Sequence, residues 1–293
     1  MIVEQGTLAP GRMRAGKPYP RRNTGWRDQD MKLSLLTYLI ARQWDLDRII
    51  KAAQACGFAG IELRVEAGHA HGVDLELTPA QRRAVRDRIE DAYLEVACIG
   101  TSSRFDTPDR AKRQAVIERT QRYIELAADL GCRRIRVFGN DMPAGVRRDD
   151  CARYVGESLR TLGQFAEPLG VDVLLEMHGQ FNYWGFARQA VETANHPRVG
   201  IVYNCDPRDM VAGSVAATYS RVRGWIRHVH MHEFLGPYPY PELFGLLQTD
   251  AYDGYCSSEI EVEFPSPEQY LALYAALFRA WAGQPFFPAP EQI

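Results

Sequence analysis

Four apolar, strand-like runs in the second half of the chain each end in a side chain that can bind a divalent metal ion. The runs are LLEMHG, GIVYNCD, HVHMHE and SSEIE, and the candidate ligands are Glu176, Asn204, His230 and Glu259. Successive ligands are separated by 28, 26 and 29 residues. One strand and its return helix take about 30 residues, so the ligands recur once per β/α unit. Because the ends of successive strands converge on one face of a closed parallel barrel, this recurrence predicts a single metal centre.

Two of these runs hold alternating series of ionisable residues: His228, His230 and His232 in HVHMHE, and Glu259, Glu261 and Glu263 in SSEIEVE. Alternate residues of a strand project to the same side. The three histidines are therefore expected at a deep, a central and an outer position on one face of their strand. Glu176 follows DVLL, a strand expected to be buried on both faces, where an unpaired charge is costly unless a metal or a partner is present.

The elements that must position these residues alternate along the chain as strand, helix, strand, helix. Amphipathic segments stop at glycines suited to a left-handed helix cap, and an apolar run follows within a few residues, as in AAQACGFAGIEL and FAEPLGVDVLLEM. The predicted strands lie near 33–38, 60–63, 95–99, 134–138, 172–177, 199–203, 227–231 and 256–260. The predicted helices lie near 45–56, 79–92, 109–130, 148–168, 185–195, 211–222, 240–250 and 267–282.

Eight such units predict a single α/β domain, a (β/α)8 TIM barrel over residues 31–283. An open doubly wound sheet uses similar units, but its ligand lies at one switch point, which gives no reason to end four successive strands in polar ligands. The chain has no GxGxxG and no GxxxxGK[ST] nucleotide loop. Residues 1–30 carry no periodic apolar pattern and are expected to form a flexible N-terminal arm, and residues 284–293 a C-terminal tail.

Composition restricts the partners of the chain. The 35 basic and 37 acidic residues leave a net charge of −2, which disfavours a nucleic-acid partner and favours a small-molecule substrate. Six scattered cysteines without a CxxC pair are typical of reduced thiols, and neither a membrane span nor a signal core is visible, so we expect a cytoplasmic protein. The C-terminal FFPAPEQI segment can cover either a neighbour in a homo-oligomer or its own barrel.

LGVDVLLEMHG, RVGIVYNCDP, HVHMHE and GYCSSEIE together resemble the xylose-isomerase-like TIM-barrel superfamily of sugar phosphate isomerases and epimerases. The resemblance covers nearly all of residues 32–282, and its specific part is the order Glu, Asp or Asn, His, Glu on strands five to eight. It implies that Glu176, Asn204, His230 and Glu259 hold Mn²⁺, Mg²⁺, Co²⁺ or Zn²⁺. It also implies a carbohydrate substrate that His178, two residues after Glu176, contacts.

The sequence departs from the family at one ligand. Relatives most often have aspartate where IVYNCDP presents Asn204, whose amide oxygen can ligate but brings no charge. Asp206 lies on the same side of the strand and can supply the missing charge from the loop. Two interpretations stay open: Asn204 ligates directly, or it hydrogen-bonds a neighbour and the metal is held weakly or not at all.

Further substrate contacts are expected from Asp206 and His232. Glu62, at the end of GIEL with Arg64 beside it, is expected either to support the metal ligands from behind or to contact the substrate. The GHAHG loop holds His69 and His71. It is either a solvent loop, or a lid or second-metal site.

The expected function is a metal-dependent isomerase or epimerase of a small sugar or related polyol or keto compound. Glu176 and Glu259 would be its catalytic pair, passing a proton through an enediolate. The alternatives are a keto-cyclitol dehydratase on the same barrel and a barrel that binds sugar without chemistry. An apurinic-endonuclease-like hydrolase is disfavoured because IEL, CIG and VFG at the early strand ends supply no histidine for a metal cluster. Neither the substrate nor its phosphorylation follows from the sequence.

Overall fold

The computed structural model describes residues 30–284 as one closed barrel of eight parallel strands in sequential order. The strands are β1 (Lys32–Leu36), β2 (Gly60–Arg64), β3 (Glu95–Arg104), β4 (Arg134–Phe138), β5 (Asp172–Glu176), β6 (Val199–Asn204), β7 (Ile226–Met231) and β8 (Tyr255–Ser258). The predicted (β/α)8 fold is confirmed. The predicted arm and tail, except for residues 30 and 284, lie outside the described residues.

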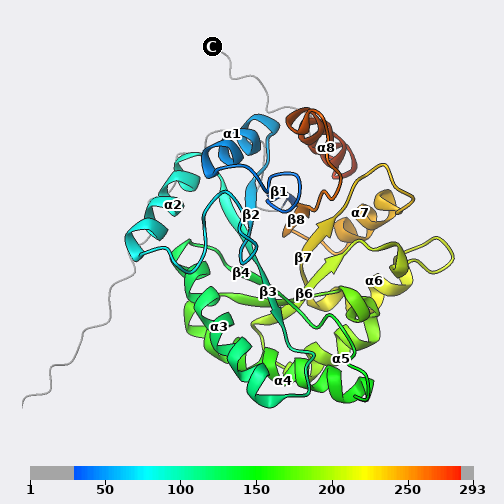
Figure 1. Ribbon diagram of the computed structural model, residues 1–293. Coiled ribbons are helices and arrows are strands. Elements are labelled where there is room, and N and C mark those ends of the chain that lie inside the picture. Colours follow the sequence, from blue (N-terminus) through cyan, green and yellow to red (C-terminus); the bar gives the residue numbers. More distant parts are fainter. Residues whose placement is uncertain (1–29, 285–293) are drawn as a thin grey trace, which may run out of the picture.

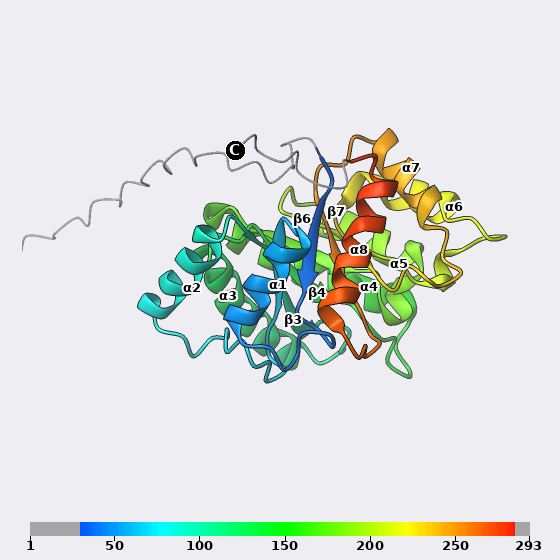
Figure 2. The same cartoon turned by 90° about the horizontal axis from the view of Figure 1, so that it is seen from above.

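A ring of helices surrounds the strands (Figure 1). The helices are α1 (Leu46–Cys56), α2 (Pro79–Asp91), α3 (Arg110–Asp129), α4 (Arg148–Ala166), α5 (Trp184–Ala194), α6 (Ala216–Val222), α7 (Tyr240–Thr249) and α8 (Pro267–Trp281). The first and last helices lie side by side in both views (Figures 1 and 2) and are joined by an ion pair of 2.7 Å between Arg48 and Glu268. The ring is therefore closed by contacts between the two ends of the barrel sequence.

Local sequence explains where these helices begin and end. Thr78 caps α2 with a reciprocal side-chain bond to Gln81, and Pro79 takes the first helical position. Gly57 ends α1 with φ of 73°, a left-handed conformation that glycine adopts without strain. After α7 the left-handed residue is Ala251, with φ of 51°, and not the glycine in TDAYDGYC. The glycine cue therefore does not hold at every helix end.

Two predicted boundaries were wrong. The third strand continues past Gly100 to Arg104 and so carries Ser102 toward the open end of the barrel. The sixth helix begins at Ala216 and not near residue 211, because Ala212 and Gly213 both have positive φ and turn the chain between Val211 and Ser214. Both differences fall at the end of the barrel where the carboxyl ends of the strands lie.

Candidate active site

Three of the four predicted ligands meet at the carboxyl ends of β5, β7 and β8. His230 Nδ1 lies 3.3 Å from Glu259 Oε2 and 3.5 Å from Glu176 Oε1. One ligand atom from each of the three residues lies within 4.8 Å of the others. All three side chains are buried or nearly so. The ligands that recur once per β/α unit in the sequence thus form a compact group of two carboxylates and one imidazole.

A further buried carboxylate, that of Glu62, lies behind this group. Glu62 of β2 is fully buried and accepts from His228 Nε2 at 2.8 Å and from Ser257 Oγ at 2.6 Å. His230 Nε2 lies 3.1 Å from both Glu62 carboxylate oxygens. With Nε2–H donating to Glu62, the Nδ1 lone pair of His230 is free to ligate, in the carboxylate–histidine arrangement common behind metal ligands. Glu62 does not line the cavity, so this position does not suit the predicted substrate contact.

The electrostatics of the three-residue group favour a cation. Burial lowers the pKa of His230, but Glu62, Glu176 and Glu259 outweigh it and raise that pKa well above its ordinary value. His230 Nδ1 and Glu259 Oε2 are buried and have no hydrogen-bond partner among the described residues. Buried polar atoms without partners are costly. A divalent cation would satisfy both atoms and neutralise the surrounding carboxylates, so the donor set fits such an ion.

Arg136 of β4 contributes a charge that the sequence analysis missed. Its Nε lies 3.0 Å from Glu176 Oε2, and both side chains are almost fully buried. Burial raises the pKa of Glu176, but Arg136 and His230 together bring that pKa well below its ordinary value. Glu176 is therefore held as a carboxylate. The signal available in the sequence was an arginine inside the otherwise apolar strand RIRVF.

Asn204 ends β6 and pairs in register with His230 on β7. His232 Nε2 lies 2.8 Å from its Oδ1, which leaves that oxygen a second lone pair. Asp206, by contrast, is already neutralised: it caps a short 3-10 helix and forms a two-pronged ion pair with Arg208. Burial raises the pKa of Asp206, but Arg208 lowers it overall. Asp206 lines the cavity but is not a free charge beside Asn204.

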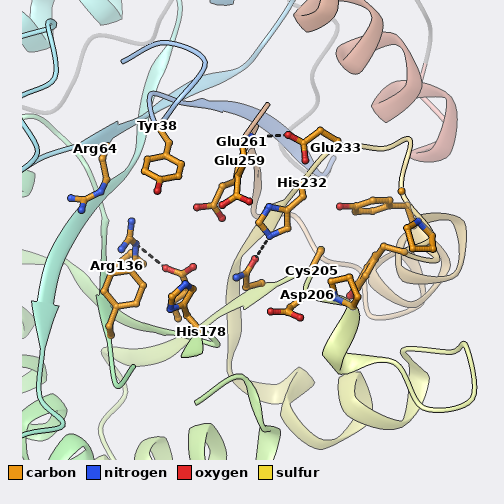
Figure 3. Close-up of a pocket in the computed structure, with 18 of the residues that line it drawn as sticks. Tyr38, Arg64, Arg136, His178, Cys205, Asp206, His232, Glu233, Glu259 and Glu261 are labelled. Carbon is orange, nitrogen blue, oxygen red and sulfur yellow. Dashed lines mark hydrogen bonds and ion pairs between the residues drawn. The ribbon is translucent and has the colours of Figure 1, made fainter. Parts of the chain in front are cut away.

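A cavity of about 600 Å³ opens above these residues (Figure 3). His178 and His232 both line it. His178 Nδ1 lies 2.8 Å from Asn140 Oδ1, so the ring has a fixed partner at the cavity wall. Glu261 also lines the cavity, whereas Glu263 is exposed outside it. Of the predicted substrate contacts, His178, Asp206 and His232 reach the cavity.

The GHAHG loop is packed against the barrel. His69 and His71 are both 8% exposed and their rings stack. His71 Nδ1 accepts from the Val73 N–H at 3.0 Å, and His71 Nε2 lies 3.1 Å from the Arg64 carbonyl oxygen. Neither residue belongs to the metal-ligand groups found in the described part of the chain. His71 therefore serves hydrogen bonding and His69 packs against it, and neither forms a metal-ligand group with other described residues.

The described residues form a closed eight-strand TIM barrel with side chains that could bind a metal ion at the ends of β5, β7 and β8. Residues 50–280 match the family of xylose isomerase-like TIM barrels, and the chain belongs to this family.

Individual relatives are more distant. A candidate L-ribulose-5-phosphate 3-epimerase of Haemophilus influenzae, SgbU, is 24% identical over 132 residues, and the match covers 44% of this chain and 46% of that protein. The chain thus spans less than half the length of this curated relative. The structure of the 3-keto-D-glucoside 4-epimerase YcjR from E. coli is similar, with a TM-score of 0.71, 20% identity, and coverage of 85% of this chain and 99% of that one. The zinc-binding IOLI protein has a TM-score of 0.68, 16% identity, and coverage of 86% and 96%.

None of the helices in residues 30–284 has the length and apolar character needed to cross a bilayer.

Proposed function

We propose that this protein is a divalent-metal-dependent epimerase or isomerase of a small sugar or related keto compound. The observation that supports this most is the group of Glu176, His230 and Glu259, which combines two carboxylates and one buried imidazole. Its two carboxylates line a cavity large enough for a sugar. The epimerase relatives and the zinc atom bound in the IOLI protein agree with it.

In this proposal Glu176, Asn204, His230 and Glu259 hold the metal ion, and Glu62 fixes the orientation of His230 from behind. A bound divalent ion would polarise a substrate carbonyl and acidify the neighbouring C–H. Glu176 and Glu259 come from β5 and β8, on either side of His230, and exchange the proton at the neighbouring carbon. Return of the proton to the opposite face gives an epimer, and return to the adjacent carbon gives an isomer.

His178 and His232 are proposed to orient substrate hydroxyl groups, because both line the cavity and each has its own partner, Asn140 and Asn204. Asp206, with its charge balanced by Arg208, is proposed to accept a hydrogen bond at the rim.

The test is proton exchange in D₂O. Protein loaded with Mn²⁺ is expected to exchange the C–H beside the carbonyl of a ketose, followed by NMR. Glu176→Gln and Glu259→Gln are each expected to reduce exchange by about a thousandfold or more, because an amide cannot take the proton. Glu263→Gln is the matched control, since Glu263 is exposed outside the cavity. If Glu259→Gln exchanged the proton at the wild-type rate, Glu259 would not be one of the two catalytic residues.

Metal analysis separates an enzyme from a barrel that only binds sugar. The purified protein, after reconstitution and gel filtration, is expected to retain one divalent ion per chain. Protein that retains none after reconstitution with Mn²⁺, Co²⁺ or Zn²⁺ would contradict the proposed metal site.

A further inference from the structure

The wall of the cavity formed by β2, β3 and β4 is cationic. Arg64, Arg104 and Arg136 all line the cavity there. Figure 3 shows Arg64 and Arg136 together on one side, beside Tyr38, with His232 and Asp206 on the other. The arginine wall therefore lies across the cavity from the loop that follows β6.

Two of these arginines have carboxylate partners. Arg136 pairs with Glu176 at 3.0 Å, and Arg104, which is exposed, lies 3.8 Å from Asp141. Arg64 differs: no carboxylate of the described residues lies within 4.0 Å of its guanidinium group. Two acidic residues lie two positions from Arg64 in sequence: Glu66 is paired with Arg119 at 3.1 Å, and Glu62 is bonded to His228 and Ser257. Arg64 is thus a partly buried cation without a counter-ion in the described part of the chain.

The Arg64 side chain is fixed in this position. Its Nη1 donates to the Gly100 carbonyl at 3.0 Å and also to the Val65 carbonyl, and its Nη2 donates to Ser102 Oγ at 2.6 Å. Its backbone N–H donates to Thr37 Oγ1 at 2.9 Å. Three of the five guanidinium N–H groups are used in these bonds, while the Nε–H and the second Nη2–H have no partner among the described residues. These two donors lie on one edge of the fork, which is the arrangement that binds an oxyanion with two parallel bonds.

Gly100 leaves room for the two guanidinium groups. A Cβ atom at this position would lie 3.1 Å from Arg136 Nη2 and 3.5 Å from Arg64 Cδ. Burial, and then repulsion by Arg136, lower the pKa of Arg64 to about 10, so it is still charged at neutral pH. The two carboxylates nearby already have partners: Glu176 pairs with Arg136, and Glu62, whose Oε1 lies 3.4 Å from the same point, is bonded to His228 and His230. Arg64 is the guanidinium group left without a paired carboxylate among the described residues.

We propose that Arg64 binds an anionic substituent of the substrate, so that the substrate is an acidic sugar, bearing a carboxylate or a phosphate, and not a neutral one. This inference rests on the proposed function, because the arginine wall lines the same cavity as Glu176 and Glu259. The reacting carbonyl end of the substrate lies at that group, and the anionic end lies at Arg64, with Ser102 Oγ as a neighbouring polar contact.

The first experiment compares three ketoses that differ only at C6: D-fructose, D-fructuronate and D-fructose 6-phosphate. Their affinities for the Mn²⁺-loaded protein are measured by calorimetry. We expect at least one acidic sugar to bind about tenfold or more tightly than D-fructose. Whichever acidic sugar binds more tightly identifies the anion as carboxylate or phosphate. Equal affinities, tighter binding of D-fructose, or no binding of either acidic sugar up to about 10 mM would overturn the inference.

The second experiment removes the guanidinium group. Arg64→Met is expected to reduce the preference for the acidic sugar to about threefold or less. Arg64→Lys keeps the positive charge but not the two-pronged guanidinium group, and it is expected to retain an intermediate preference for the acidic sugar. This variant replaces Arg64→Met in the test if Arg64→Met does not fold. Arg153→Met is the control, because it removes the same charge from the exposed face of α4. A preference that survives both Arg64 variants would place the anion elsewhere.

Metal binding distinguishes the two proposals. Protein that binds one Mn²⁺ per chain but shows no preference for acidic sugars would overturn the role of Arg64 and leave the proposed function standing. Protein that binds no metal would contradict the proposed function itself.

Discussion

At the scale of single residues, Asn204 decides how strongly the site attracts a metal ion. Its register partner is His230, and it brings an oxygen ligand without a charge. The nearby carboxylate of Asp206 is occupied by Arg208, and that of Glu176 is partly balanced by Arg136. The net negative charge around the proposed ion is therefore lower than two glutamates would suggest, which predicts moderate affinity for a hard cation.

Asn204→Asp is therefore expected to tighten Mn²⁺ binding by about tenfold, since an added carboxylate strengthens the hold on a hard cation. His232 Nε2–H can donate to a carboxylate as it does to the amide, so the local packing is kept. Competition with a chelating dye measures the affinity without any assay of turnover. The matched variant Asn204→Ala is expected to weaken binding, and unchanged affinity in both variants would show that Asn204 is not a ligand.

The proximity of Glu176, His230 and Glu259 could be predicted from the sequence, because each lies at the end of an apolar strand and the ends of parallel strands converge. It did not identify Arg136, and it gave Arg64 only as a neighbour of Glu62. The sequence separation between an arginine on an early strand and the ligands on later strands does not indicate whether they are in contact. Only the closed barrel, in which β8 pairs with β1 and the strand ends surround one cavity, shows what these arginines contact.

At the scale of elements, the packing of α4 on α5 depends on a glycine inside a helix. A Cβ atom at Gly156 of α4 would lie 2.5 Å from Thr193 Cβ and 2.6 Å from the Ala190 carbonyl oxygen, both on α5. Gly245 of α7 is also helical, but its missing Cβ would meet nothing within 4 Å. The two glycines thus differ in packing and not in backbone conformation.

Gly156→Ala is expected to lower the free energy of unfolding by about 1 to 3 kcal/mol, because the helices must separate. Gly245→Ala is expected to raise it by about 0.5 to 1 kcal/mol, because alanine favours the helix. Urea unfolding of both variants measures the difference. A stabilised Gly156→Ala protein would show that α4 and α5 can move apart freely.

Element boundaries were harder to predict than element types. The closed barrel of eight strands follows from repeated β/α units and was predicted correctly. The extension of β3 beyond Gly100 was missed because a glycine inside a strand has the same appearance as a strand end. The late start of α6 depends on the left-handed Ala212, a conformation that the residue type does not indicate.

At the scale of the whole molecule, stability depends on pH through Asp209, in the loop after β6. Its side chain is 2% exposed, and burial, followed by repulsion from Asp206, raises its pKa to about 8. Between the ordinary value of 3.8 and about 8, the folded state binds more protons at this position than the unfolded state does. The contribution of Asp209 to the free energy of unfolding therefore falls as the pH rises through this window.

Asp209→Asn is expected to stabilise the protein at pH 8 relative to wild type, and to lose this advantage as the pH falls toward 4. Each pH unit is worth about 1.4 kcal/mol at most, so three units between pH 5 and 8 set an upper limit of about 4 kcal/mol. Urea unfolding of both proteins across that range gives the two slopes. Parallel slopes would mean that Asp209 is not held protonated in the folded state.

The position of Glu259, one residue beyond β8, has a consequence for biosynthesis. Among the described residues, β8 is the last strand that the ribosome delivers, and it pairs with β1, where Ser257 Oγ lies 2.6 Å from Ser34 Oγ. A growing chain already carries Glu176 and His230, but it has no second carboxylate beside His230 Nδ1 until β8 docks. Nascent and truncated chains therefore lack the complete site. Assembly of the Glu176–His230–Glu259 group is thereby coupled to the docking of β8, which closes the barrel.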